Sequence, residues 1–198
     1  LVMESIIIWS LGLVFAYLLG SIPTAYLVVR YRKGLDIRKM GDGNSGAANV
    51  ARVMGAKTGI FVGIIDIFKG SITLTLVVWL LGSGIGMVGG MIAIIGHNWP
   101  VYLLGRGGRG VAVGIGVLLA LLPYLAFPIA MVGLLILAIT RKARLAIGFF
   151  FITLPFLICF IGNYSLVYIG YSFLIPVLVG VSHFISVRYT TRESTGTV

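Results

Sequence analysis

Long apolar segments separated by short polar loops constrain this chain more than any other feature. Seven can be drawn, at about 5–29, 58–81, 86–104, 111–123, 125–140, 145–162 and 166–187. Of the 198 residues, 59% are hydrophobic and only 10% are charged, whereas soluble domains carry about 25% charge. A helix needs roughly 17–25 apolar residues to cross a bilayer, and most of the segments reach that length. The sequence therefore predicts an all-α, polytopic membrane protein with seven transmembrane helices, formed as a single domain over residues 1–198.

The positions of the cations predict how these helices are oriented. Lysines and arginines gather in the loops after the first, third, fifth and seventh segments, and the intervening loops carry none. Cytoplasmic loops are enriched in Lys and Arg, so seven helices place the N-terminus outside and the C-terminus inside. Merging the short, proline-flanked fourth and fifth segments would give six helices and divide the cations between both faces. The net charge of +10 thus follows the membrane topology and does not indicate nucleic acid.

Two further expectations concern the ends of the chain. Residues 5–29 have no Lys or Arg before them and form a long run, so a retained first helix is expected rather than a cleaved signal. Residues 190–198 are polar and are expected to be disordered.

Two glycine-rich, cationic loops interrupt the apolar pattern on the predicted cytoplasmic side. The first glycine loop is GDGNSGAANVAR, residues 41–52, and the second is GRGGRG, residues 105–110. Glycine lets a ligand approach the backbone, and N–H groups at a helix N-terminus combined with guanidinium groups suit phosphate. Each loop also fits a flexible, positively charged turn, and residues 47–54 are expected to form a short interfacial helix. The phosphate-binding candidates in these loops are Gly43, Asn44, Ser45, Asn49, Arg52, Arg106, Gly107, Gly108, Arg109 and Gly110.

Several polar residues fall inside the predicted membrane helices. Asp66 and Lys69 are three residues apart and share a helix face. Since ionisable groups are costly in a membrane, they form either a structural ion pair or part of a site. His97, two turns before the predicted end of its helix, fits a hydrogen-bonded core histidine or a residue that orders the second glycine loop. His183 is expected to be structural, and Pro23 is expected to kink the first helix.

Four motifs together resemble the bacterial integral-membrane glycerol-3-phosphate acyltransferases that use acyl phosphate. They are GSIP at 20–23, GDGNSGAANVAR at 41–52, DIFKG at 66–70 and GHNWPVYLLGRGGRGVAVGIG at 96–116. The resemblance covers most of residues 20–116, and the part of the chain after residue 116 agrees mainly in hydropathy. Where the family has a loop serine this chain has Asp42, and where the family has two lysines it has Arg106 and Arg109. The family's C-terminal His, Asn and Glu motif is not evident, and His183 stands too early for it.

The resemblance implies transfer of a fatty acyl group from acyl phosphate to the first hydroxyl of glycerol 3-phosphate. The products would be lysophosphatidic acid and phosphate, made for phospholipid synthesis at the cytoplasmic face of the bacterial inner membrane. It implies membrane lipid as the surroundings and no metal, coenzyme A, nucleotide or nucleic acid; the oligomeric state stays open. The resemblance makes Asp42, Arg52 and His97 the catalytic candidates and adds Lys69 to the substrate-binding ones. A carboxylate at Asp42 either repels phosphate or serves as a base on the glycerol hydroxyl.

Two other functions remain open from the sequence. The departures from the family pattern also fit a divergent relative that uses another acceptor or donor. A non-catalytic protein that binds anionic lipid, or an anion transporter, is a further alternative. Transport is disfavoured because no internal repeat is visible and because the cations gather at one face rather than along a path.

Overall fold

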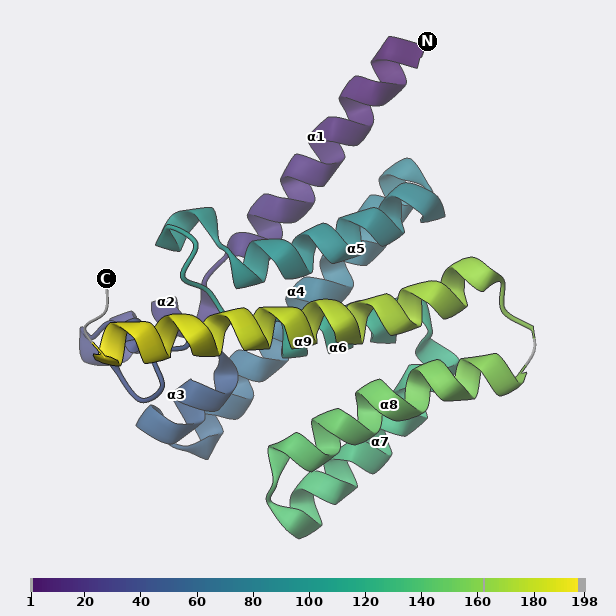
Figure 1. Ribbon diagram of the computed structural model, residues 1–198. Helices are drawn as coiled ribbons and strands as arrows, with labels where there is room; N and C mark the ends of the chain where they lie inside the picture. Colours follow the sequence, from purple (N-terminus) through teal and green to yellow (C-terminus); the bar gives the residue numbers. More distant parts are fainter. Residues whose placement is uncertain (1, 162, 196–198) are drawn as a thin grey trace.

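The computed structural model describes residues 2–161 and 163–195, with side chains through residue 186. In this part of the chain all regular structure is helical, which confirms the all-α prediction (Figure 1). The elements are α1 (Val2–Ser21), α2 (Thr24–Lys33), η1 (Ile37–Lys39), α3 (Ala47–Met54), α4 (Ala56–Leu81), α5 (Ser83–Asn98), η2 (Val101–Leu103), α6 (Val111–Leu121), α7 (Pro123–Thr140), α8 (Ala143–Ile161) and α9 (Leu166–Thr195).

The helices include five segments that can cross a membrane. Within the described ranges, these are Val2–Lys33, Ala56–Leu81, Pro123–Thr140, Ala143–Ile161 and Leu166–Ser186. The two other apolar helices are shorter, α5 with 16 residues and α6 with 11. A helical membrane protein is therefore confirmed, and helix length by itself supports five crossings where the sequence predicted seven.

Three predicted helix boundaries differ from the structure. Pro23 does more than kink the first helix, because neither Ile22 nor Pro23 is helical and α1 and α2 are separate. Proline lacks an N–H and disfavours the helical conformation of the residue before it. The third helix ends at Asn98 rather than at 104, so His97 lies in its last turn. The backbone of α9 is helical through Thr195, so disorder from residue 190 is wrong for 190–195; residues 196–198 lie outside the described ones.

Glycines allow α4 and α6 to pack with their backbones in contact. A Cβ atom added to Gly70 would overlap the carbonyl oxygen of Val113, and one added to Gly116 would overlap that of Ile67. Close approach through small residues is a common way for helices to associate in lipid, where hydrophobic burial gives no advantage. This contact fixes the start of α6, and with it the second glycine loop, relative to α4.

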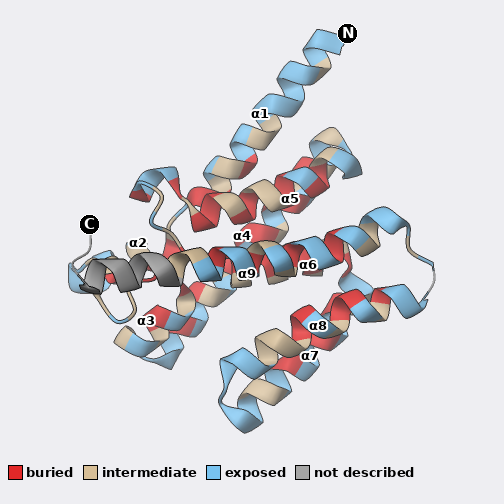
Figure 2. Cartoon of the chain, in the orientation of Figure 1, coloured by how far each residue is buried: buried red, intermediate tan, exposed pale blue. Residues whose placement is uncertain are grey.

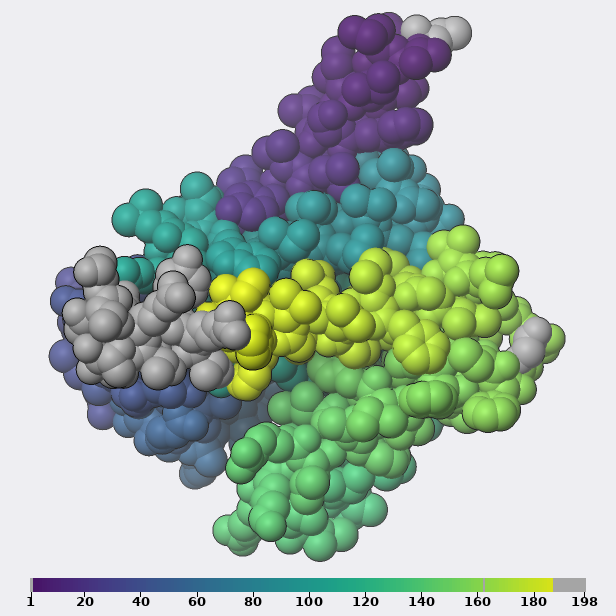
Figure 3. Space-filling model, viewed as in Figure 1, coloured from purple at the N-terminus to yellow at the C-terminus, as the bar shows by residue number. Residues whose placement is uncertain are grey.

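The core lies where α4, α5 and α6 meet the later helices. Its buried residues come from all helices between α4 and α9, among them Ile94, Leu118, Leu154 and Ile175. Figure 2 shows that burial is concentrated in this central region and that the N-terminal half of α1 is mostly exposed. That half projects beyond the bundle, as Figures 1 and 3 both show. Most of its exposed side chains are apolar, including Ile7 and Leu11, which suits contact with lipid.

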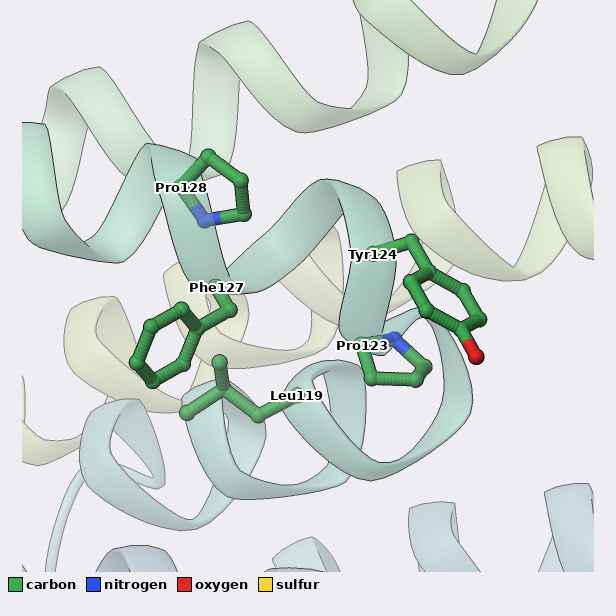
Figure 4. Close-up of a pocket in the computed structure, with 5 residues that line it drawn as sticks. All are labelled: Leu119, Pro123, Tyr124, Phe127 and Pro128. Carbon is green, nitrogen blue, oxygen red and sulfur yellow. The ribbon is translucent and has the colours of Figure 1, made fainter.

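An apolar hollow of about 420 Å³ lies at the turn between α6 and α7 (Figure 4). Its lining consists of Leu119, Pro123, Tyr124, Phe127 and Pro128. The two helices form the tight connection that the prolines predicted, with Leu122 between them. The hollow is at the opposite end of α6 from the second glycine loop and contains no charged group, so it is not a phosphate site.

Candidate active site

The first glycine loop is folded around the side chain of Asn49, which comes from α3. Asn49 is fully buried, and its Nδ2 donates to the carbonyl oxygens of Met40 at 2.8 Å and Asn44 at 2.9 Å. Its Oδ1 accepts from the backbone N–H of Asp42 at 3.1 Å and from Arg52 Nη1 at 3.3 Å. The helix predicted at 47–54 is confirmed as α3. Asn49 was predicted to bind substrate. Its hydrogen bonds hold the first glycine loop in place, and that loop carries the candidates Asp42 and Asn44.

Replacement of Asn49 with leucine is expected to destabilise the protein by about 3 kcal/mol, because it leaves several buried loop groups without a partner. Thermal unfolding in detergent measures this change. Asn163, exposed in the turn before α9, provides a matched control in Asn163→Leu. Equal unfolding temperatures for the two variants would contradict the positioning role of Asn49.

The second glycine loop is fastened to the end of α5. The N–H groups of Gly107 and Gly108 donate to the carbonyl oxygens of Asn98 at 3.2 Å and His97 at 3.0 Å. These two N–H groups satisfy carbonyl groups at the end of α5. The groups in this region that remain for an anion are the backbone N–H groups in the first turn of α6, which follows Gly110, and the arginine side chains.

The two glycine loops meet directly. The N–H of Ser45 donates to the carbonyl oxygen of Gly107 at 3.3 Å. Arg38, in η1 just before the first loop, forms an ion pair with Asp36 at 2.7 Å and donates to the carbonyl oxygen of Leu103 in η2 at 3.2 Å. The hydrogen bond from Arg38 holds the pKa of the Asp36 carboxyl below its ordinary value. Neither residue was a candidate in the sequence, yet together they link η1 to η2, the segments that precede the two loops.

Asp42 joins the arginines of the two loops. Its Oδ2 lies 3.1 Å from Arg52 Nη1 and 3.4 Å from Arg109 Nη2. Its Oδ1 accepts from the N–H of Asn44 at 3.2 Å. The Arg109 side chain is 19% exposed and that of Arg52 is 57% exposed, whereas Arg106 is exposed on the loop surface. The structure thus brings together Arg52 and Arg109, two of the three loop arginines predicted to bind phosphate, and both contact a carboxylate.

Buried polar atoms that lack a hydrogen-bond partner gather at the same place. Among the described side chains they are Asn44 Oδ1, Ser45 Oγ, both amide atoms of Asn98, Arg109 Nε and, at the end of α1, Ser21 Oγ. A buried polar atom without a partner is costly and rare in a folded protein. Most of this set belongs to the two glycine loops or to the end of α5 that supports them. Such a concentration of unused donors and acceptors is typical of a site for a polar ligand.

A buried cluster of polar side chains, Thr24, Asp66, Lys69 and His97, packs against the second glycine loop. Lys69 Nζ lies 3.1 Å from Asp66 Oδ1 and 3.2 Å from His97 Nδ1, and it donates to the carbonyl oxygen of Ile22 at 2.8 Å. Thr24 donates to Asp66 at 2.9 Å. The break at Pro23 makes the Ile22 carbonyl available, because that residue is not helical. The other edge of the His97 ring lies against Gly108, so the cluster connects the α1–α2 break to the second loop.

Replacement of Lys69 with methionine is expected to cost about 3–5 kcal/mol, because it leaves the buried Asp66 carboxylate without its cation. Both side chains are at most 5% exposed. The double variant Asp66→Asn, Lys69→Met removes both charges and is expected to recover most of that loss. Unfolding in detergent compares the three proteins, and acyl transfer by a folded double variant separates a structural pair from a substrate-binding one. A double variant less stable than Lys69→Met would contradict the ion pair.

The sequence interpretation expected His183 to be structural, and the structure places it near charged residues of both glycine loops. It lies on α9, close enough to Asp42 and Arg109 for an electrostatic interaction with both. The predicted topology could have suggested this position. With seven crossings, the C-terminal end of the last helix lies on the cytoplasmic side of the membrane, where both glycine loops are predicted to lie. The described residues contain no group of three or more His, Cys, Asp or Glu side chains that could hold a metal ion.

The chain is similar in sequence to known proteins over most of its length. The sequence profile of the glycerol-3-phosphate acyltransferases matches residues 10–193. The chain is 37% identical over 190 residues to glycerol-3-phosphate acyltransferase 1 of Dehalococcoides mccartyi, covering 92% of this chain and 91% of that protein. It is 39% identical to the glycerol-3-phosphate acyltransferase of Prochlorococcus marinus, covering 83% and 84% of the two chains.

A solved structure is also similar. The crystal structure of PlsY (YgiH), an integral membrane glycerol 3-phosphate acyltransferase, in its glycerol 3-phosphate form superposes with a TM-score of 0.78 at 33% identity. The match covers 95% of this chain and 92% of that chain. The fold and the sequence over almost the whole length therefore lead to the same conclusion: the chain belongs to the glycerol-3-phosphate acyltransferase family.

Proposed function

We propose that this glycerol-3-phosphate acyltransferase of phospholipid synthesis takes its acyl group from acyl phosphate. One observation carries the proposal: Arg52 and Arg109, from loops far apart in the sequence, converge within 3.4 Å of one carboxylate oxygen. Two guanidinium groups at one point suit a phosphate group. Both substrates carry phosphate, and the unused polar atoms of Ser45 and Asn98 lie beside the same loops.

The reaction needs little from the protein beyond positioning and charge. The first hydroxyl of glycerol 3-phosphate attacks the acyl carbon, the bond from that carbon to the phosphate oxygen breaks, and phosphate leaves with the bonding electrons. The two arginines neutralise phosphate charge, which holds the reactants together and stabilises the developing negative charge. Asp42 is the candidate base that accepts the hydroxyl proton, and its carboxylate is one-third exposed at 30%. His97 acts through Gly108 as a positioning residue.

The acyl chain requires an apolar surface that reaches the site. A hollow of about 210 Å³ lies between the α1–α2 break and α4, lined by Leu19, Ile22, Thr24, Ile65, Phe68, Lys69 and Ile72. Most of its lining side chains are apolar. Lys69, which also lines it, belongs to the buried polar cluster that packs against the second loop. We assign the chain of the acyl phosphate to this surface because it joins the lipid-facing side of α4 to polar groups near the loops.

In this proposal residues 1–198 act as one membrane-embedded domain of a bacterial inner membrane. α5 and α6 complete seven crossings with the N-terminus outside, and both glycine loops face the cytoplasm. The distribution of cations supports this orientation, since loops on one predicted side carry all the loop lysines and arginines. The substrates are acyl phosphate and glycerol 3-phosphate, with no bound metal, nucleotide or nucleic acid.

Purified protein in detergent, supplied with palmitoyl phosphate and labelled glycerol 3-phosphate, tests the proposal directly. Lysophosphatidic acid is the expected product of the native chain. Asp42→Ser is assayed alongside, because serine stands at this position in the family that the sequence resembles. Product from Asp42→Ser but not from the native chain would refute the proposed activity. Product with another acceptor but not with glycerol 3-phosphate would favour a relative with a different substrate.

A further inference from the structure

We propose that Asp42 is a resident anion of the phosphate site. In the absence of phosphate its carboxylate holds Arg52 and Arg109, and an incoming phosphate must displace it to bind the same two guanidinium groups. The inference rests on the proposed function, because it takes these arginines as the phosphate-binding groups. It adds a residue that sets the affinity for phosphate, in the substrate and in the product alike.

The geometry gives Asp42 the contacts that a phosphate group would make. One oxygen, Oδ2, is within 3.1 Å of Arg52 Nη1 and 3.4 Å of Arg109 Nη2. The other, Oδ1, accepts the N–H of Asn44, so the loop itself aims the carboxylate. Carboxylate and phosphate oxygens are equivalent acceptors for a guanidinium group. The carboxylate therefore occupies the same donors that the proposed substrate requires.

The contacts are also of a kind that a ligand can replace. The side chains of Asp42 and Arg52 are 30% and 57% exposed, and ion pairs this open to water are individually weak. The structural hydrogen bonds of the loop are made instead by Asn49, which is fully buried. Displacement of Asp42 thus leaves the loop framework intact and costs little.

The balance of charge then sets the effect on affinity. Two guanidinium groups and one carboxylate leave a single net positive charge at this point. A phosphate monoester carries about −1.5 to −2 charges near neutral pH. The resident carboxylate therefore weakens binding of glycerol 3-phosphate and of the released inorganic phosphate. Its return to the arginines after acyl transfer favours departure of that phosphate, which limits product inhibition.

Calorimetric titration with inorganic phosphate tests this role without requiring turnover. The proteins are the native chain, Asp42→Asn and Asp42→Ser, each confirmed as folded by its unfolding temperature. The Kd for inorganic phosphate is expected to fall about tenfold in both variants, because a like charge is removed beside the ligand. Glu4→Gln is the control, since it also removes one carboxylate, from the N-terminal half of α1 that projects beyond the bundle (Figure 1). Its Kd is expected to stay within about twofold of the native value.

The possible results separate this inference from the proposed function. Unchanged or weaker phosphate binding in the folded Asp42 variants would overturn the resident-anion role, even if the native protein makes lysophosphatidic acid. An equal gain in Glu4→Gln would also overturn it, since the effect would then come from overall charge. Absence of both phosphate binding and acyl transfer in every protein would instead refute the proposed function, and the inference with it.

Discussion

Replacement of Arg52 with alanine is expected to reduce acyl transfer about 1,000-fold, the scale of losing a principal group that stabilises charge in a transition state. Arg52 contributes one of the two guanidinium groups that converge on Asp42, at 3.1 Å. It also receives support from Asn49 Oδ1 at 3.3 Å, so its head group is positioned rather than loose. Formation of lysophosphatidic acid from palmitoyl phosphate measures the effect.

The control for this variant is Arg32→Ala. Arg32 is an exposed arginine at the end of α2 and belongs to neither glycine loop. Its replacement removes the same charge and the same side-chain volume, and we expect the rate to remain within about threefold of the native rate. Arg52→Ala with native turnover would remove Arg52 from the active site and with it the proposed phosphate pair.

Replacement of Gly108 with alanine is expected to lower the rate about 100-fold, the cost of shifting a catalytic element by about 1 Å. A Cβ atom at this position would overlap Nε2 of His97. The ring cannot easily yield, because its Nδ1 is 3.2 Å from Lys69 Nζ. The second glycine loop must therefore move, and it carries Arg109 with it.

Gly84→Ala provides the matched control for the Gly108 substitution. Gly84 lies near the start of α5, and a Cβ atom there would meet nothing within 4 Å. Because alanine favours helix more than glycine does, this variant should be at least as stable as the native protein. If Gly108→Ala were as active as Gly84→Ala, the contact between His97 and the second loop would have no part in positioning Arg109.

Much of the candidate site could be named from the sequence, because glycines and arginines in short loops have a local chemical meaning. The role of each of these residues could not be predicted from the sequence. Asn49 was expected to bind substrate, and the structure adds that its Nδ2 bonds loop carbonyls. Gly107 and Gly108 were expected to belong to a phosphate-binding loop, and the structure shows that their N–H groups bond the end of α5. Each role depends on which partner lies opposite in space, and the partner is set by packing between elements.

The membrane helices, the all-α class and the family membership were determined by the sequence itself. Hydropathy is a sum over neighbouring residues, so the apolar segments and the loops between them can be identified without a fold. Only the tertiary structure decided that Asp42 would join Arg52 to Arg109, and that Lys69 would use the Ile22 carbonyl beside Pro23. Those contacts link residues between 10 and 67 positions apart, and hydrogen bonds depend on distances of a few tenths of an ångström that local sequence does not set.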